Sequence, residues 1–259
     1  MTVADELTDS PAAEASAPVY VYGVVRAGAI APKSLEGVAG RPVTTIESDG
    51  LAAVTSDLVG APLRVRRRDL LGHLRVLETV FAETTIVPCA FGMVLSSRGA
   101  VDSELLVGRR NELLALLERL DGQVQLNVTA SYDEEAVLRE IVQEDPEIAR
   151  LRARTRALGA AGHFESIRLG ERVARALEER RAADAERLLG RLGREAEDAV
   201  VDPVSETVVL KASFLVANGR RASFDAALED LVAAEAPRIT FESIGPLPPT
   251  VFATLEATG

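Results

Sequence analysis

Residues that build redox, metal and disulfide sites are scarce in this sequence. Its 259 residues include one cysteine, two histidines and no tryptophan. A single cysteine, Cys89, excludes an intramolecular disulfide, and His73, His163 and Cys89 lie too far apart in the sequence for the close ligand spacing of a metal site. We therefore predict no metal and no cofactor. We interpret His73 as structural or surface-exposed, His163 as a loop or capping residue, and Cys89 as a buried thiol.

Motifs for nucleotide binding and catalysis are also missing. The sequence has no GxxxxGK(S/T) loop, no GxGxxG turn that opens a helix after a strand, and no GxSxG nucleophile motif. Its formal net charge is −11, whereas nucleic-acid-binding proteins usually present a basic face. The residues therefore show no catalytic centre, and we predict a protein that does not bind nucleic acid. The one local basic cluster, Arg64 with Arg66 to Arg68, is interpreted as solvated arginines near a helix start, and docking of an acidic partner helix is the alternative.

Hydrophobic runs are short. The longest, such as Val19 to Val25 and Ile86 to Val94, fall well below the roughly 20 apolar residues of a membrane helix. No stretch combines the charged start, apolar middle and small-residue cleavage site of a secretion signal. The sequence therefore predicts a cytoplasmic protein without a membrane partner. Residues 1–18, rich in Ala, Ser, Pro and acidic residues, are expected to form a disordered tail.

Strand patterns open the folded part of the chain. Val19 to Val25 is apolar at almost every position, which is typical of a central strand covered on both faces. Asp49 and Gly50 separate two β-prone runs and predict a tight hairpin. Further on, Ile86 to Leu95 contains Pro88 and Gly92, which indicates an edge strand or a bulge.

Two amphipathic helices are predicted around that strand. The first should begin near Asp69, whose carboxylate can accept from the free amides of the first turn. The second should begin at Asp102 or Ser103 and end at Gly122. The apolar positions expected to face the core recur at helical spacing. In the first helix these are Leu70, Leu74, Leu77 and Phe81, and in the second they are Leu106, Leu113, Leu117 and Leu120.

The second half alternates strands with long helical segments. Gln123 to Tyr132 reads as a half-buried strand, and helices follow from Glu134 to about Ala157 with a break near Pro146. Gly159 to Gly162 is expected to be a hinge. Phe164 to Val200 is expected to form one long amphipathic helix, with a helical hairpin as the alternative. A strand around Val208 to Val216, a short helix and a final strand after Pro237 complete the pattern.

These elements predict an α+β protein of two domains. We place the boundaries at 1–18 for the tail, 19–120 for the first domain and 121–259 for the second, although the pattern leaves open which domain contains the strand at Val124. In the last segment, Ile239 and Phe241 are expected to face a core. Gly245 to Pro249 should form a rigid turn that directs Phe252 back onto the fold.

Three stretches of the sequence carry a family resemblance. They are VYVYGVV at Val19 to Val25, His73 with Val76 and Glu78 followed by VPCAFG, and IGPLPPTVF at Ile244 to Phe252. From Val19 to Phe252 the chain resembles the gas vesicle protein GvpF/GvpL family, with the F-like branch favoured. The positions that carry the resemblance, and that we take as candidate interaction residues, are Tyr20, Tyr22, Gly23, Pro88, Phe91, Gly92, Gly245, Pro246, Pro248, Pro249 and Phe252.

The resemblance implies both a fold and a role. The fold would be two α+β domains, the first a modified ferredoxin-like domain and the second closed by the C-terminal tail. The role would be non-enzymatic, that of a chaperone-like accessory factor or minor component in gas vesicle assembly, which binds the hydrophobic GvpA-like shell protein and other accessory proteins. Two alternatives remain open: a small-molecule-binding regulator or enzyme with its site between two ferredoxin-like domains, and a general scaffold that uses Phe164 to Val200.

Overall fold

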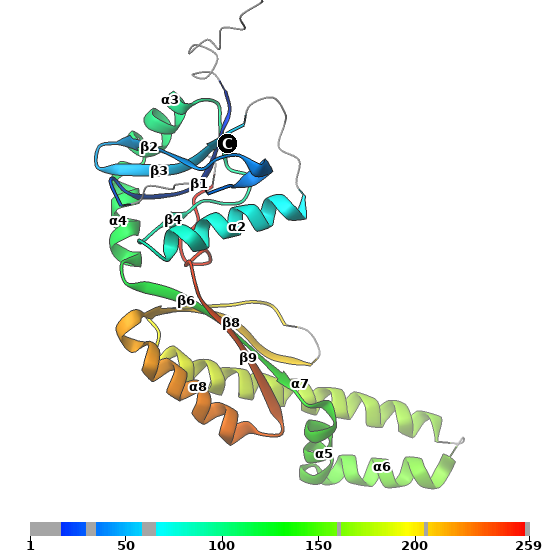
Figure 1. The fold of residues 1–259 in the computed structure, drawn as a ribbon. Coiled ribbons are helices and arrows are strands. Elements are labelled where there is room, and N and C mark those ends of the chain that lie inside the picture. Colours follow the sequence, from blue (N-terminus) through cyan, green and yellow to red (C-terminus); the bar gives the residue numbers. More distant parts are fainter. Residues whose placement is uncertain (1–16, 30–34, 59–65, 160–161, 205–206, 257–259) are drawn as a thin grey trace, which may run out of the picture. The chain divides into compact units, whose positions relative to one another are not determined.

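The computed structural model describes residues 17–29, 35–58, 66–159, 162–204 and 207–256. Contacts divide the chain into two compact units (Figure 1). The first contains the described residues up to Val124 together with those from Leu247 onward, and the second is Gln125–Pro246. Each unit combines a sheet with packed helices, which confirms the α+β class. Most of the tail predicted at 1–18 lies outside the described residues.

The sheet of the first unit is organised around a buried central strand. Its order is β2-β3-β1-β4, and β5 also pairs with β1. The bounds are β1 Val19–Arg26, β2 Thr44–Ser48, β3 Leu51–Asp57, β4 Val87–Pro88 and β5 Val94–Leu95. Strand β1 pairs antiparallel with β3, β4 and β5, and it is buried from Val19 to Val25. The prediction of a strand covered on both faces is therefore confirmed.

The β2–β3 hairpin forms where Asp-Gly predicted it. Asp49 has a φ of 47° and Gly50 a φ of 83°, so both turn residues adopt the left-handed conformation that a two-residue hairpin requires. Among the described residues, only the short helix η1, Val38–Gly40, lies between β1 and this hairpin, so the first unit departs from the β-α-β-β-α-β order of a regular ferredoxin-like domain.

Helix α2, Arg67–Phe81, packs on the sheet with a different face from the predicted one. Val76 and Leu77 are buried, but Leu70 is 41% exposed and Leu74 is 39% exposed, so the predicted stripe is wrong at those two positions. The reason is a close contact at Gly72, where a Cβ would lie 3.2 Å from the Gly37 carbonyl oxygen. That approach turns the face around Gly72 toward the core and the first-turn leucines outward.

Asp69 also differs from its predicted role. It is buried, and its Oδ1 accepts the Ala39 N–H at 3.2 Å across the fold instead of capping its own helix. Ala39 belongs to the short helix η1, Val38–Gly40. Of the basic cluster, Arg64 lies outside the described residues, and Arg66 to Arg68 are exposed at the start of α2.

The second helical segment of this unit begins earlier than predicted. Ser97 caps it by accepting the Ala100 N–H, and the chain runs through α3 Arg98–Ala100 and the π-helix η2 Val101–Val107 into α4 Arg110–Leu120. All four predicted leucines are buried, as expected. Gly122 follows the helix end with a φ of 66°, as expected for a glycine that terminates a helix.

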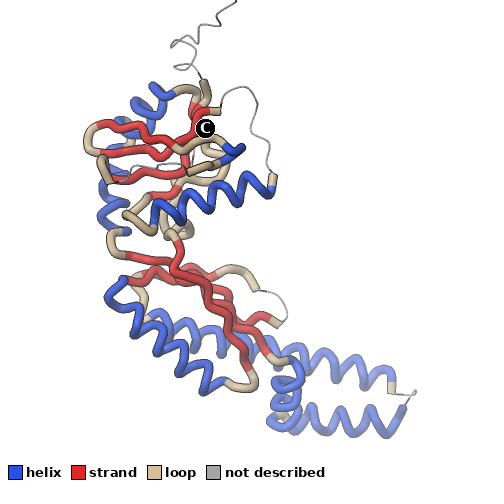
Figure 2. The backbone as a smooth tube through the Cα atoms, in the orientation of Figure 1, coloured by secondary structure: helices blue, strands red, loops and turns tan. Residues whose placement is uncertain are grey.

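The second unit contains a four-stranded sheet of order β7-β8-β6-β9. The bounds are β6 Gln123–Tyr132, β7 Asp198–Val201, β8 Val208–Ala217 and β9 Ile239–Leu247. Helix α7, His163–Gly193, and helix α8, Arg221–Glu235, both pack on β8 (Figure 2). Phe214 of β8 and Phe224 of α8, with ring centroids 5.2 Å apart, lie in the core between the sheet and these helices.

Three helices extend this unit beyond its sheet. Helix α5, Glu134–Glu144, and helix α6, Pro146–Leu158, are separated at Asp145, whose carboxylate caps α6, so the break predicted near Pro146 is confirmed. Helix α6 packs along α7 as a hairpin. Helix α7 ends at Gly193 because residues from Asp198 onward pair with β8, so the prediction of helix up to Val200 is wrong. The predicted hinge at 159–162 lies partly outside the described residues.

The last strand, β9, lies mainly in the second unit, whereas the tail that follows it belongs to the first. β9 is the terminal strand of its sheet; Ile239 is buried, whereas Phe241 is only half-buried. Beyond it, Leu255 exchanges hydrogen bonds with the β4 region of the first unit, donating to the Pro88 carbonyl at 3.0 Å and accepting the Ala90 N–H at 2.8 Å. This pairing groups the tail with the first unit, which differs from the division expected at 121–259.

Candidate functional site

The first two motif stretches meet in a cluster of rings, which we name the tyrosine–histidine cluster. It consists of Tyr20 and Tyr22 from β1, His73 from α2 and Phe91 from the loop after β4. Ring centroids lie 4.8 Å apart for the two tyrosines, 5.7 Å for Tyr22 and His73, and 5.7 Å for His73 and Phe91. His73 is 3% exposed and both tyrosines are fully buried. The motif residues are thus brought together inside the first unit.

Hydrogen bonds fix the protonation of His73. The Tyr20 hydroxyl accepts the Gly92 N–H at 3.0 Å, which leaves its own proton for Nδ1 of His73, also at 3.0 Å. Burial lowers the pKa of His73 to about 4, against the opposing effect of a hydrogen bond with the Cys89 backbone. The ring is therefore neutral near pH 7. Burial likewise raises the pKa of Tyr20, so its hydroxyl keeps its proton.

Tyr22 ties β1 to the loop after it. Its hydroxyl accepts the Val38 N–H at 2.8 Å and lies 3.0 Å from Ser56 Oγ. Because Ser56 Oγ donates to the Pro42 carbonyl at 2.8 Å, its oxygen accepts the Tyr22 proton. A Cβ at Gly37 would lie 1.9 Å from the Tyr22 oxygen, so a glycine is required there. The Tyr22 hydroxyl, the one polar group of this side chain, is therefore engaged in hydrogen bonds that stabilise the first unit.

Gly23 and Pro88 allow β1 and β4 to approach closely. The two residues are register partners, and a Cβ at Gly23 would lie 2.7 Å from both Ile86 Cδ1 and the Val87 carbonyl oxygen. The Cys89 N–H then donates to the Tyr22 carbonyl at 2.8 Å. Strand β4 therefore lies between β1 on one side and the tail residue Leu255 on the other. Pro88 indicated an edge strand, and Leu255 covers that edge.

Cys89 behaves as the sequence indicates. Its side chain is 2% exposed. Burial raises the pKa of the thiol to about 12, although the charge of Arg109 acts in the opposite direction. The thiol is protonated near pH 7, which is the state of a structural rather than a nucleophilic cysteine.

The third motif stretch differs from the turn predicted at Gly245 to Pro249, because Gly245 to Leu247 continue strand β9 and the turn follows at Thr250 to Phe252. A Cβ at Gly245 would lie 2.6 Å from Leu126 Cδ2, so the backbone of β9 packs directly on β6 at this point. Pro246 is exposed, but Pro248 and Pro249 are buried. The Phe252 N–H donates to the Pro249 carbonyl at 3.2 Å, and the Phe252 ring is buried. This stretch directs the chain from β9 back into the first unit.

A charged cluster in the second unit was missed by the sequence reasoning. Asp184 of α7 accepts from Tyr132 at 2.7 Å and from Arg187 at 2.8 Å, and it also pairs with Arg238. Glu235 pairs with both arginines. Asp184 and Glu235 are 7% and 8% exposed. Burial would raise the pKa of Asp184, but the hydrogen bonds from Arg238, Tyr132 and Arg187 outweigh it and hold the pKa below its usual value.

This cluster joins α7, α8, β6 and the start of β9. Each carboxylate is matched by an arginine, so the cluster serves as a clamp within the unit. The signal available in the sequence was the i,i+3 spacing of Asp184 with Arg187 and of Glu235 with Arg238. No local pattern in the sequence indicates that Asp184 and Arg238, which lie 54 positions apart, come together in the fold.

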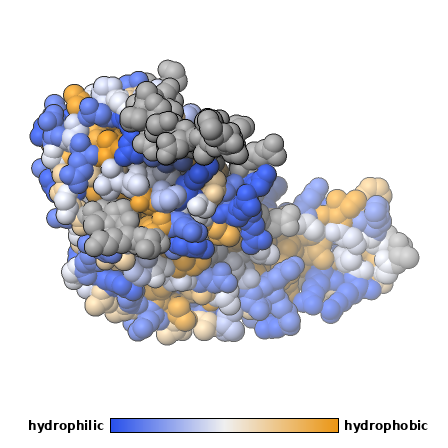
Figure 3. Space-filling model, turned by 45° about the horizontal axis from the view of Figure 1, so that its top comes forward, coloured by the Kyte–Doolittle hydropathy of each residue, from blue (hydrophilic) through white to orange (hydrophobic). Residues whose placement is uncertain are grey.

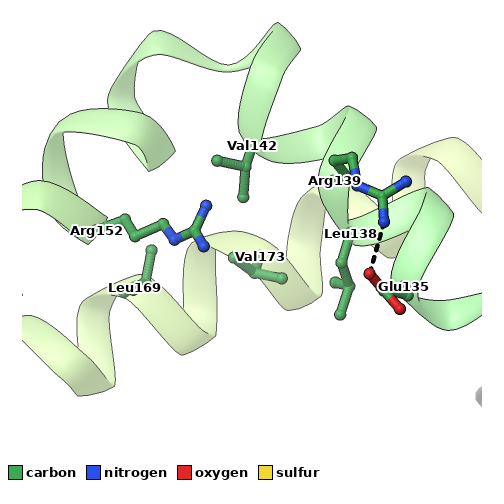
Figure 4. A pocket seen from close by; sticks show the side chains of 7 residues that line it. All are labelled: Glu135, Leu138, Arg139, Val142, Arg152, Leu169 and Val173. Atoms are coloured by element: carbon green, nitrogen blue, oxygen red, sulfur yellow. Dashed lines mark hydrogen bonds and ion pairs between the residues drawn. The ribbon is translucent and has the colours of Figure 1, made fainter.

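Apolar and cationic surface gathers on the helical extension of the second unit. A groove of about 400 Å³ lies between α5, α6 and α7, and we name it the hairpin groove (Figure 4). Its lining residues are Glu135, Leu138, Arg139, Val142, Arg152, Leu169 and Val173. Figure 3 shows apolar patches on the helical arm at the right of the view, bordered by hydrophilic residues. The described residues include no cluster of His, Cys, Asp and Glu suited to a metal ion.

Other exposed apolar side chains lie on α2 and β9. Leu71 is 50% exposed and lies beside Leu70 and Leu74, while Ile244 on β9 is 60% exposed. Within the described parts of the chain, no helix combines the length and the apolarity needed to cross a membrane.

Comparison with known proteins gives consistent matches along the chain. The family described as gas vesicle synthesis protein GvpL/GvpF matches residues 18–254. Gas vesicle protein F of Streptomyces sp. (strain CB03234) is 37% identical over 238 residues, which cover 90% of this chain and 98% of that protein. Gas vesicle protein F1 of Halobacterium salinarum is 26% identical over 239 residues, covering 90% of this chain and 92% of that protein.

Solved structures show the same fold. The crystal structure of GvpF from Anabaena sp. PCC7120 superposes with a TM-score of 0.80 at 23% identity, covering 93% of this chain and 99% of that one. GvpF from Microcystis aeruginosa superposes with a TM-score of 0.71 at 22% identity, covering 92% and 100% of the two chains.

Proposed function

Because the chain belongs to the gas vesicle synthesis protein GvpL/GvpF family, we propose that it is an accessory factor that binds the hydrophobic shell protein and other accessory proteins while a gas vesicle nucleates. The observation that carries this proposal is the match over residues 18–254, together with a 37% identical relative named gas vesicle protein F. The family's name points to a structural or assembly role rather than to catalysis.

The physical need for such a factor follows from the nature of a hydrophobic shell. A subunit with exposed apolar strands aggregates unless a partner covers those strands before they enter the wall. A soluble protein can do so by pairing an edge strand with the subunit or by covering an apolar segment with a helix face. The net charge of −11 keeps the complex dispersed, since like-charged particles repel one another.

Two surfaces of this chain fit such contacts. β9 is the terminal strand in its sheet, and its residues from Glu242 to Pro246 are exposed, among them the apolar Ile244. On the first unit, Leu70, Leu71 and Leu74 form an apolar face on α2. The motif residues themselves are mostly buried, so they support these surfaces from within and are poor candidates for direct contact.

Coexpression with the shell protein tests the proposal. Affinity-tagged chain should recover the shell protein and keep it in the soluble fraction, and a strain without the gene should form few or no vesicles. Ile244→Asp should reduce recovery through β9, whereas Ser243→Asp adds the same charge at the neighbouring position and serves as its control. Leu71→Asp tests the α2 face in the same assay. Recovery of no shell protein, with normal vesicles in the deletion strain, would reject the proposed function.

A further inference from the structure

The hairpin groove has the form of a helix-binding site. Its floor is built from aliphatic side chains of two helices, Leu138 and Val142 on α5 and Leu169 and Val173 on α7 (Figure 4). All four are half-buried, so they remain open to a further partner. A concave aliphatic floor between helices accepts the apolar face of another helix, whose residues at i, i+3, i+4 and i+7 enter the groove.

Two of the three helices around the groove carry a charge opposite to that of the whole protein: α6 and the first part of α7 are basic, whereas α5 is acidic. Residues 146–175 contain seven arginines and three glutamates, in a chain with a net charge of −11. Arg152 extends over the groove between Val142 and Leu169 (Figure 4). Arg156 follows four residues later and therefore lies on the same side of α6.

Five of these seven arginines lack the ion-pair partners that arginines have elsewhere in the same unit, whereas Arg154 pairs with Glu165 and Arg172 pairs with Asp145. Nearer the sheet, Arg180 pairs with Glu140, and Arg191 pairs with Asp230 and Glu195. By contrast, within the described chain no carboxylate lies in ion-pair distance of a group of arginines on α6 and early α7. These are Arg150, Arg152, Arg156, Arg168 and Arg175.

We propose that the hairpin groove binds an acidic amphipathic helix of a partner protein. The apolar stripe of that helix packs on the aliphatic floor, and its Asp or Glu side chains face Arg152 and Arg156. Helix α6 has 13 residues, about 20 Å at 1.5 Å per residue, which matches a partner segment of roughly four turns. The inference deepens the proposed function and rests on it for the biological source of the helix.

A designed peptide tests the chemistry without the shell protein. The probe is a fluorescent peptide of about 18 residues with leucines at helical spacing and glutamates beside them, titrated with the full chain in fluorescence anisotropy. A peptide of the same composition in scrambled order should bind at least about tenfold more weakly. Raising the salt concentration from about 0.05 M to about 0.5 M should weaken the ordered peptide severalfold, because exposed charges are screened.

Matched charge reversals locate the site. Arg152→Glu with Arg156→Glu should weaken binding about tenfold. The control, Arg150→Glu with Arg154→Glu, makes the same charge change on the same helix but about 200° around its axis. Although it also removes the Arg154–Glu165 ion pair, it should change binding by less than about twofold. Val142→Asp should also weaken binding, and thermal melting establishes that each variant is folded.

Several outcomes would overturn the inference. They are equal binding of ordered and scrambled peptides, equal effects of the two double variants, or binding of anionic phospholipid vesicles in place of the peptide. The shell-protein coexpression assay reports separately, since failure to recover the shell protein rejects the proposed function while the peptide result stands.

Discussion

The buried His73 should make folding stability depend on pH. In the folded protein burial lowers the pKa of His73 to about 4, whereas an unfolded histidine titrates near 6.5. Between these values the unfolded chain binds a proton that the folded protein excludes, so stability falls as the pH is lowered from about 6.5 to about 4 and changes no further through this residue below that. A difference of about 2.5 pKa values corresponds to a loss of up to about 3 kcal/mol.

Urea unfolding of the unaltered chain and of His73→Gln, followed by circular dichroism from pH 7.5 to 4, measures this term. The variant removes the titrating ring, so the difference in unfolding free energy between the two proteins should change by up to about 3 kcal/mol over that range. Tyr20, Tyr22 and Cys89 have pKa values raised by burial, and none of them titrates in this range. His163→Gln is the matched control, since His163 is exposed. A difference that stays constant from pH 7.5 to 4 would refute the reasoning.

Two further substitutions test the packing of each unit. Gly23→Ala should lower the unfolding free energy by about 1–3 kcal/mol, because the added Cβ would lie 2.7 Å from Ile86 Cδ1. Gly170→Ala places its Cβ in open space on a helix and should instead raise the unfolding free energy by about 1 kcal/mol. Thermal melting of the two variants compares these effects. Asp184→Asn should lower the unfolding free energy by about 3 kcal/mol, because it removes the buried charge that pairs with Arg187 and with the half-buried Arg238. An unchanged melting temperature would contradict the clamp.

Local sequence patterns predicted most of the secondary structure. The alternation at β6, the four leucines of η2 and α4 and the Asp49–Gly50 turn depend on neighbours in sequence, and all were predictable. The face of α2 was not, because it depends on the contact of Gly72 with Gly37. The spacing of leucines along α2 predicts the wrong buried face, because the backbone contact at Gly72 determines which side of the helix packs on the sheet.

Contacts between segments far apart in the sequence could not be predicted from local patterns. Leu255 bonds to the strand at Pro88, so the tail joins the first unit although it follows β9 of the second. Asp184 meets Arg238 in the same way, across 54 positions. The proline and glycine spacing of the last stretch predicted a turn, but a turn does not specify which sheet edge the chain reaches next.

The residues that identify the family and the surfaces proposed to bind partners are different sets, and this separates two kinds of mutational effect. Tyr20, Tyr22 and His73 form a buried hydrogen-bonded cluster, so substitutions there act through stability and should impair every binding activity of the first unit together. Arg152 and Arg156 lie on an exposed helix without carboxylate partners among the described residues. Their reversal should remove one partner while leaving the melting temperature unchanged. A variant that loses partner binding therefore locates a contact surface only when its unfolding free energy is measured alongside.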